Sequence, residues 1–95
     1  MVELLAGNVL LKPCQKRRVL SHLRRSDRLS DRLGDSRLAL SVRKVGRHFE
    51  AKAKCHNRRG DLECKARDTT WETAVLRVVR SLHDQVHAQR LAVAS

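Results

Sequence analysis

Residues 47–85, RHFEAKAKCHNRRGDLECKARDTTWETAVLRVVRSLHDQ, decide the fold of this chain. Within residues 49–55, apolar residues stand at every second position, with charged or polar residues between them. The same alternation returns at residues 62–66, after the Asn-Arg-Arg-Gly sequence at 57–60. Such alternation is typical of strands with one buried face, and the residues at 57–60 favour a reversal of the chain. The stretch therefore predicts a β-hairpin with a basic outer face.

An amphipathic helix is predicted directly after this hairpin. Thr69 and Glu72 have the spacing of a capping box, in which each side chain satisfies a free backbone N–H at the start of a helix. The apolar residues downstream share one helical stripe, namely Trp71, Val75, Val78, Val79, Leu82 and Val86. We expect this helix to end near residue 90 and residues 91–95 to form a frayed tail.

The first part of the chain predicts a strand at residues 2–6, a helix over about 14–33 and a strand at 37–43. Ser26 and Ser30 interrupt the thin apolar stripe of this helix, so we expect it to dock loosely. The predicted order is strand, helix, three strands, helix. This order favours an α+β fold, with two helices packed on one face of an antiparallel or mixed four-stranded sheet.

Size and charge limit the possible classes of protein. The 95 residues, 41% of them hydrophobic, suit a single domain, which we place at residues 1–90. Lys and Arg number 21 against 10 Asp and Glu, and the net charge of +11 favours nucleic acid as the partner, with anionic membrane second. Since Phe49 and Trp71 are the only aromatic residues, we expect contacts with the nucleic-acid backbone rather than stacking on bases.

The sequence also indicates a compartment. No apolar run approaches the ~20 residues that cross a bilayer, and the N-terminal residues lack the pattern of a signal peptide. Three cysteines are an odd and sparse set, unlike a disulfide framework. We therefore expect a cytoplasmic protein in a reducing environment, with no membrane partner.

Residues 47–85 also resemble a known family, the ribosome hibernation promoting factors and ribosome-associated inhibitors, also called sigma-54 modulation proteins. The matching positions lie in the hairpin turn, the second strand and the helix: Gly60, Asp61, Leu62, Ala66, Trp71, Ala74, Val75, Leu82 and Gln85. Near the first predicted strand, Gly7-Asn8-Val9 is similar to the family's Gly-x-Asn-Val, one residue shorter. Because the chain ends soon after the second predicted helix, the resemblance implies a divergent short-form member of the family.

The resemblance implies that the protein binds ribosomal RNA of the small ribosomal subunit and silences translation under stress or in stationary phase. It implies no enzymatic activity, no cofactor and no small-molecule substrate, and it suits a monomer, although a homodimer stays open. In the family, basic residues on the two helices contact RNA phosphates. His22 and Arg25 match lysine-bearing positions of the first helix, and Arg90 matches one in the second. Ser81, Asp84 and Ala88 depart from the family's basic pattern.

The candidate RNA-binding residues come from both predicted helices and from the outer face of the sheet. They are Lys16, Arg17, His22, Arg24, Arg25, Arg28, Lys52, Lys54, Lys65, Arg77, Arg80 and Arg90. In the first helix the cations outnumber the nearby aspartates, so phosphate contact is favoured over pairing within the helix. On the sheet, cross-strand pairing of the lysines with Glu50 and Glu63 is an equally good interpretation.

The cysteines and histidines of the hairpin and the second helix raise the question of a metal site. Cys55 and Cys64 share the inward face of the hairpin while His56 points outward, so we expect buried thiols and no metal site. His83 and His87 lie one helical turn apart, and without a third ligand they are interpreted as surface residues near phosphate. The alternative function is a protein-interaction adaptor that uses the same scaffold to bind an acidic protein.

Overall fold

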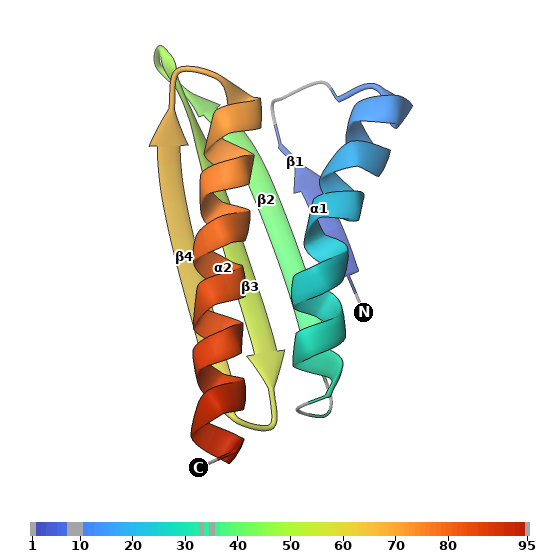
Figure 1. Ribbon diagram of the computed structural model, residues 1–95. Helices are drawn as coiled ribbons and strands as arrows, with labels where there is room; N and C mark the ends of the chain where they lie inside the picture. The colour runs from blue at the N-terminus through green and yellow to red at the C-terminus, as the bar shows by residue number, and fades with distance from the viewer. Residues whose placement is uncertain (1, 8–10, 33, 35, 95) are drawn as a thin grey trace.

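The computed structural model describes residues 2–7, 11–32, 34 and 36–94. Its elements in chain order are β1 (Val2–Ala6), α1 (Pro13–Asp31), β2 (Arg37–Val45), β3 (His48–Asn57), β4 (Gly60–Asp68) and α2 (Trp71–Ala94). Figure 1 shows this arrangement. The order and the α+β class predicted from the sequence are confirmed.

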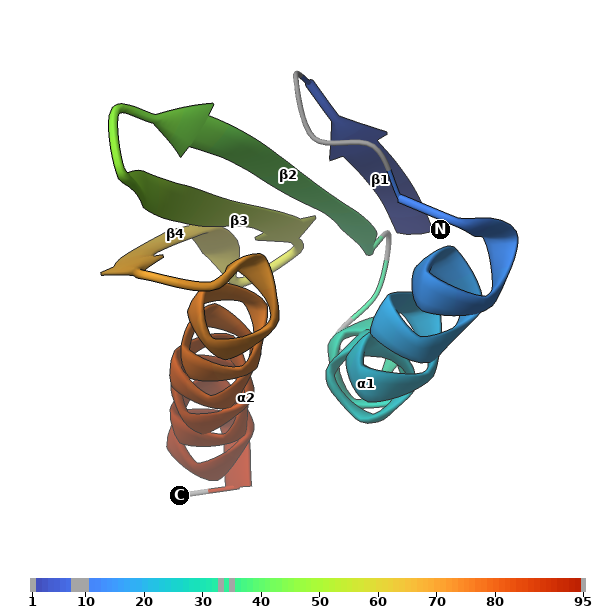
Figure 2. The same ribbon diagram turned by 90° about the horizontal axis from the view of Figure 1, so that it is seen from above.

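The sheet is mixed and its strands lie in the order β1-β2-β3-β4. Strand β1 runs parallel to β2, and α1 makes the crossover between them, whereas β2, β3 and β4 are antiparallel neighbours. The predicted hairpin has the expected register, because Asn57 pairs with Gly60 and leaves two residues in the turn. Both helices cover the same face of the sheet, and none of the described helices lies on the opposite face (Figure 2).

The core lies between the sheet and the two helices. Alternation along β3 turns Ala51 and Ala53 inward, and their small side chains let α2 lie close to the strand. Each fully buried valine or leucine stabilises the fold by roughly 1.5–3 kcal/mol. The buried apolar residues are Val19, Leu23, Leu38, Leu40, Val42, Ala51, Ala53, Cys55, Cys64, Ala74, Val75, Val78, Val79, Leu82 and Val86.

Helix α2 differs from its prediction at both ends. The cap is Thr70 rather than Thr69, because the Thr73 N–H donates to Thr70 Oγ1 over 3.3 Å. The N–H of Thr69 instead donates to Oδ1 of Asp68 over 2.7 Å, and Asp68 is the last residue of β4, two residues before the cap. At the other end, the helix continues to Ala94, beyond the expected end at residue 90. Leucine and alanine in this segment are good helix formers and extend the last turns.

Helix α1 also differs from its prediction. It ends at Asp31 rather than near residue 33, which itself lies outside the described residues. Ser26 and Ser30 are both fully buried. The Ser30 hydroxyl accepts hydrogen bonds from Ser36 Oγ at 2.7 Å and from Asn57 Nδ2 at 3.1 Å. The polar positions of the stripe therefore tie α1 to the sheet through hydrogen bonds.

Candidate nucleic-acid interface

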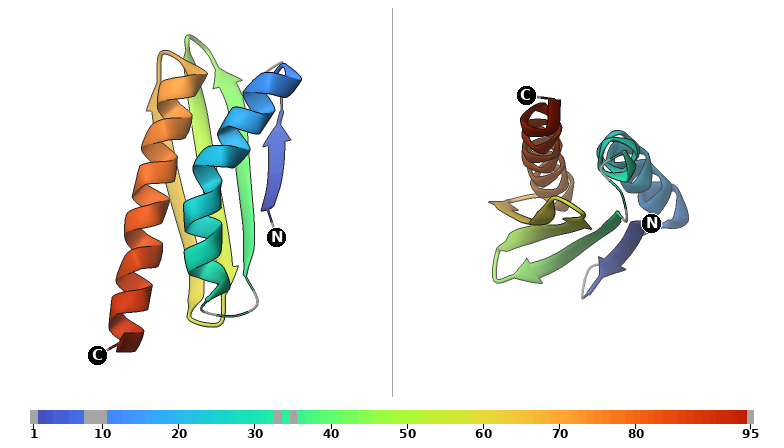
Figure 3. Two further views of the ribbon diagram at one scale, coloured as in Figure 1. Left: turned by 45° about the vertical axis from the view of Figure 1, so that its right-hand side comes forward. Right: turned by 90° about the horizontal axis from the view of Figure 1, so that it is seen from below.

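A groove runs between α1 and α2 on the helical side of the molecule. The two helices lie side by side across the sheet, as Figure 3 shows. The lining residues are Ser21, His22, Arg25 and Ser26 of α1 with Thr73, Leu76, Arg77, Val79, Arg80 and His83 of α2. No acidic side chain is among the residues that line it in the described part of the chain. We call this surface the interhelical groove.

Helical spacing explains why basic side chains face each other here. Val19 and Leu23 are buried, so the positions beside this stripe, His22 and Arg25, fall on a flank of α1. In α2 the buried stripe includes Val78 and Leu82, and Arg80 falls on the flank toward α1. Amphipathic packing of both helices on one sheet face therefore brings two basic flanks together.

The cations of the groove differ in how they are held. Arg77 Nη1 donates to the backbone carbonyl of Arg67 over 3.1 Å and lies 3.5 Å from Asp68 Oδ2, so this guanidinium is anchored to the end of β4. The backbone N–H of Thr69 and, less strongly, Arg77 lower the pKa of Asp68. For Arg25 and Arg80, by contrast, no carboxylate lies within ion-pair distance among the described residues. Their charges are available to a phosphate.

The floor of the groove is partly apolar. Val79 is buried, whereas Leu76 is 49% exposed although it is a large apolar residue. Ser26 Oγ lies 3.5 Å from His83 Nδ1, which links α1 to α2 across the floor. A ligand in this groove would therefore meet a few apolar atoms surrounded by positive charge.

The structure brings together four of the predicted RNA-binding residues, namely His22, Arg25, Arg77 and Arg80. The other predicted residues of the helices are exposed but do not line the groove; they are Lys16, Arg17, Arg24, Arg28 and Arg90. His83, interpreted from the sequence as a surface residue near phosphate, is half-buried in the groove, and Leu76 lines the groove although no role was predicted for it from the sequence. Their helical spacing from Arg80, three residues after it and four before it, was the available signal.

The predicted lysines of the outer sheet face have acidic neighbours. Lys52 Nζ lies 3.2 Å from Glu63 Oε1, and Lys65 Nζ lies 3.8 Å from the same oxygen. The hydrogen bond from Lys52 lowers the pKa of Glu63, which stays ionised. These contacts favour cross-strand pairing, the second of the two interpretations, over a free basic surface.

A second carboxylate on this face is enclosed by cations. Arg43 Nη2 donates to Glu50 Oε1 over 3.0 Å, and Arg67 Nε donates to Glu50 Oε2 over 3.2 Å. The hydrogen bonds from Arg43 and then from Arg67 lower the pKa of Glu50. The three side chains form a row across β2, β3 and β4 that is a structural ion-pair network.

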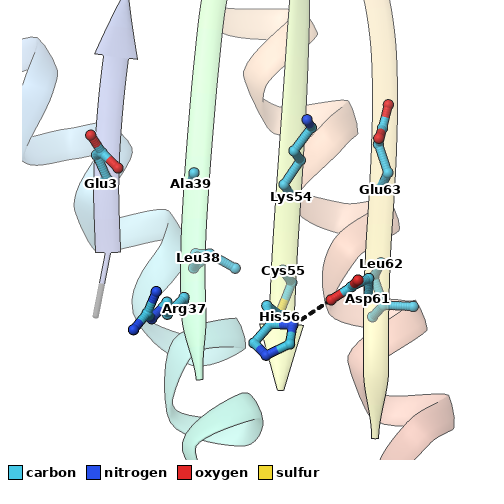
Figure 4. Close-up of a pocket in the computed structure, with 10 residues that line it drawn as sticks. All are labelled: Glu3, Arg37, Leu38, Ala39, Lys54, Cys55, His56, Asp61, Leu62 and Glu63. Atoms are coloured by element: carbon cyan, nitrogen blue, oxygen red, sulfur yellow. Dashed lines mark hydrogen bonds and ion pairs between the residues drawn. The ribbon is translucent and has the colours of Figure 1, made fainter. Parts of the chain in front are cut away.

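The outer sheet face also has a depression above Ala39, whose small side chain leaves space between taller neighbours (Figure 4). Charges of both signs surround it, with Glu3 and Glu63 facing Lys54 across the strands. The side chains of His56 and Asp61 are hydrogen-bonded at its lower end. Since its acids and bases are mixed, this depression is poorly suited to a phosphate backbone.

The cysteines lie as the sequence predicted. Cys55 and Cys64 are buried, and burial raises the pKa of the Cys55 thiol, while His56 is exposed on the other face. Among the described residues, no group of three or more His, Cys, Asp or Glu side chains is placed to hold a metal ion. No described helix is long and apolar enough to cross a membrane.

Comparison with known proteins identifies the fold. No protein-family model matches the sequence, and a search of curated proteins finds no match. The structure is similar to the N-terminal domain of Protein Y from Thermus thermophilus, with a TM-score of 0.77 and 22% identity over 94% of each chain. It is also similar to a ribosomal subunit interface protein from Coxiella burnetii, with a TM-score of 0.76 and 11% identity, covering 95% of this chain and 97% of that one. The chain has the fold that the sequence resemblance implied.

Proposed function

We propose that this protein binds the small ribosomal subunit by placing the interhelical groove against ribosomal RNA phosphates, and that it thereby silences translation in the cytoplasm of stressed cells. The observation that carries the proposal is the meeting of Arg25, Arg80 and the anchored Arg77 in a groove without lining acids. Phosphate contacts of this kind supply most of the affinity for RNA and position the protein on it.

Two further observations support the proposal. The protein from Coxiella burnetii that shares this fold is a ribosomal subunit interface protein. The net charge of +11 would attract RNA over long distances. The exposed cations of α1 outside the groove, such as Arg17 and Arg24, would extend the contact along the same helix. We expect the sheet-face lysines to contribute less, since Glu63 lies beside them.

The test is sedimentation with purified small ribosomal subunits over a series of salt concentrations. The groove variant carries Arg25→Glu and Arg80→Glu, and the matched control carries Lys54→Glu and Lys65→Glu on the outer sheet face, with the same change in net charge. We expect the groove variant to bind more weakly. The slope of the logarithm of its binding constant against the logarithm of the salt concentration should become shallower by roughly 1.4 to 1.8, because each lost phosphate contact removes about 0.7 to 0.9. The control should keep most of its affinity.

Equal losses in the two variants would show that net charge alone governs binding and would contradict the groove. The adaptor alternative predicts instead an acidic protein partner that stays bound after nuclease treatment. Inhibition is measured separately, by adding wild-type protein or the groove variant to a purified translation system. We expect the wild-type protein to lower protein synthesis and the groove variant to have little effect at the same concentration.

A further inference from the structure

Two of the side chains that line the interhelical groove are histidines, His22 and His83. We infer that RNA binding in this groove is coupled with proton uptake by these histidines, so that affinity rises as the pH falls from about 8 to about 6. The inference rests on the proposed function, since it concerns the same groove. It adds a regulation that the arginines alone would not provide, because guanidinium groups keep their charge throughout this range.

His83 is held where both of its protonation states are tolerated. Its Nδ1 lies 3.5 Å from Ser26 Oγ, and a hydroxyl can either donate a hydrogen bond to this nitrogen or accept one from it. The ring also stacks on His87, with 6.4 Å between the ring centroids and an angle of 9° between the planes. The contact with Ser26 does not have to break when the ring gains a proton.

His22 occupies the opposite wall. It is exposed on α1, three residues before Arg25 and four before Ser26, so all three fall on one flank of the helix. The wall that it faces is formed by α2, with Arg77 and Arg80. A phosphate between the walls would lie near histidines from both helices.

The groups around the two histidines are mostly cationic. Arg18 and Arg25 lie within one turn of His22 on α1, and Arg77, Arg80 and His87 come from α2. The strands beneath α2 contribute the buried thiols of Cys55 and Cys64. The acids nearest to the histidines in sequence are Asp27 and Asp84, and neither lines the groove. Asp68, at the end of β4, lies 3.5 Å from Arg77 Nη1.

This environment makes protons and phosphates bind cooperatively. A phosphate between the two helices attracts a protonated imidazole in the same way as it attracts the guanidinium groups. Binding of RNA therefore favours the protonated histidines, and by linkage protonation favours RNA to the same extent. An opposite charge within contact distance shifts a protonation equilibrium by tenfold or more, so each histidine adds about tenfold to the affinity once it is protonated.

The experiment measures the dissociation constant of the fluorescently labelled full chain for purified small subunits at pH 8, 7 and 6 and constant salt. We expect wild-type affinity to rise about 10- to 100-fold from pH 8 to pH 6. In the His22→Gln, His83→Gln double variant the rise should be less than about threefold. His48→Gln serves as the control, because His48 is an exposed histidine at the start of β3, outside the groove. The affinity of this control should depend on pH as that of the wild type does. Titration of the subunit itself affects all variants equally, so the difference between the wild type and the double variant reports on the two histidines.

Binding calorimetry in two buffers of different ionisation enthalpy counts the protons directly. We expect one to two protons to be taken up per complex near pH 7, and fewer in the single variant His22→Gln. Because His22 is exposed, the single variant His22→Gln should fold normally even if substitution of the half-buried His83 impairs folding. Uptake of no protons, or a double variant with full pH dependence, would overturn the inference.

The two proposals fail in different ways. Tight binding that is lost in the Arg25→Glu, Arg80→Glu variant but does not change with pH would refute the proton coupling and leave the groove in place. Absence of binding at every pH and low salt would refute the proposed function and the inference together.

Discussion

Replacing Asn57 with alanine removes the centre of a buried polar cluster that connects the hairpin with both helices. Asn57 is 2% exposed, and its Nδ2 donates to Ser30 Oγ of α1 over 3.1 Å and to Gln89 Oε1 of α2 over 2.9 Å. Its Oδ1 accepts from the backbone N–H of Arg59 over 2.9 Å and so closes the turn between β3 and β4. The substitution deletes all three hydrogen bonds at once.

The size of the effect follows from these contacts. A net contribution of about 1 kcal/mol per hydrogen bond gives a loss of about 3 kcal/mol in the free energy of unfolding. For a domain of this length, each kcal/mol corresponds to roughly 4–8 °C, so we expect the melting temperature to fall by about 12–24 °C. Thermal and urea unfolding followed by circular dichroism would measure both quantities.

A second variant in the same cluster tests whether the loss scales with the number of hydrogen bonds removed. Ser36→Ala removes one hydrogen bond to the same Ser30 oxygen, at 2.7 Å, and should cost about 1 kcal/mol. Asn57→Leu keeps the branched shape of the side chain, with larger terminal groups, but leaves the Ser30 and Gln89 groups without this partner, so it should be no more stable than Asn57→Ala. A loss below about 1 kcal/mol for Asn57→Ala, or a gain of stability for Asn57→Leu, would refute the reasoning.

Three further variants test single features of the fold. At Gly34, where φ is +92°, an added Cβ would lie 2.7 Å from Arg58 Cδ, so Gly34→Ala should lower the free energy of unfolding by about 2 kcal/mol. At Gly46, φ is +61° and no atom lies within 4 Å of an added Cβ, so Gly46→Ala should cost only about 1 kcal/mol. Equal costs of the two substitutions would contradict the contact with Arg58. Thr70→Ala removes the cap of α2 and should cost about 1 kcal/mol in urea unfolding, whereas Thr69→Ala should cost less. Because Arg43 and Arg67 lower the folded-state pKa of Glu50 below 4.5, its ionised form stabilises the fold above about pH 4.5, and that contribution is lost as the pH falls through the folded-state pKa. The penalty of Glu50→Gln should therefore be larger at pH 7 than at pH 3, and a penalty independent of pH would argue against this role.

Much of the fold was predictable because its determinants are local. The alternation in residues 49–55 and 62–66 defines the inward face of the hairpin, and a two-residue turn sets its register. The stripe from Val75 to Val86 likewise defines the buried face of α2. The cap was misplaced by one residue because Thr69 and Thr70 are equivalent in sequence. The side chain of Asp68 distinguishes them by holding the N–H of Thr69.

The candidate site was predictable in part. Helical spacing identified Arg25, Arg77 and Arg80 as surface cations, and their meeting in one groove depends on how α1 and α2 pack against each other. His83 joins them because Ser26, 57 positions earlier in the chain, lies against its ring. The sheet-face lysines looked equally basic in the sequence, and the pairing of β3 with β4 places Glu63 beside them.

By itself, the sequence determined the order of the elements, the inward face of each strand in the hairpin and the strongly positive charge, since these depend on neighbours within a few positions. The tertiary structure decided which cations remain available, why two serines belong in the stripe of α1, and where histidines stand among arginines. These properties depend on contacts between residues far apart in the chain, such as Asn57 with Gln89, 32 positions later. Local periodicity carries no information about such pairs, because each partner alone has the pattern of an ordinary polar residue.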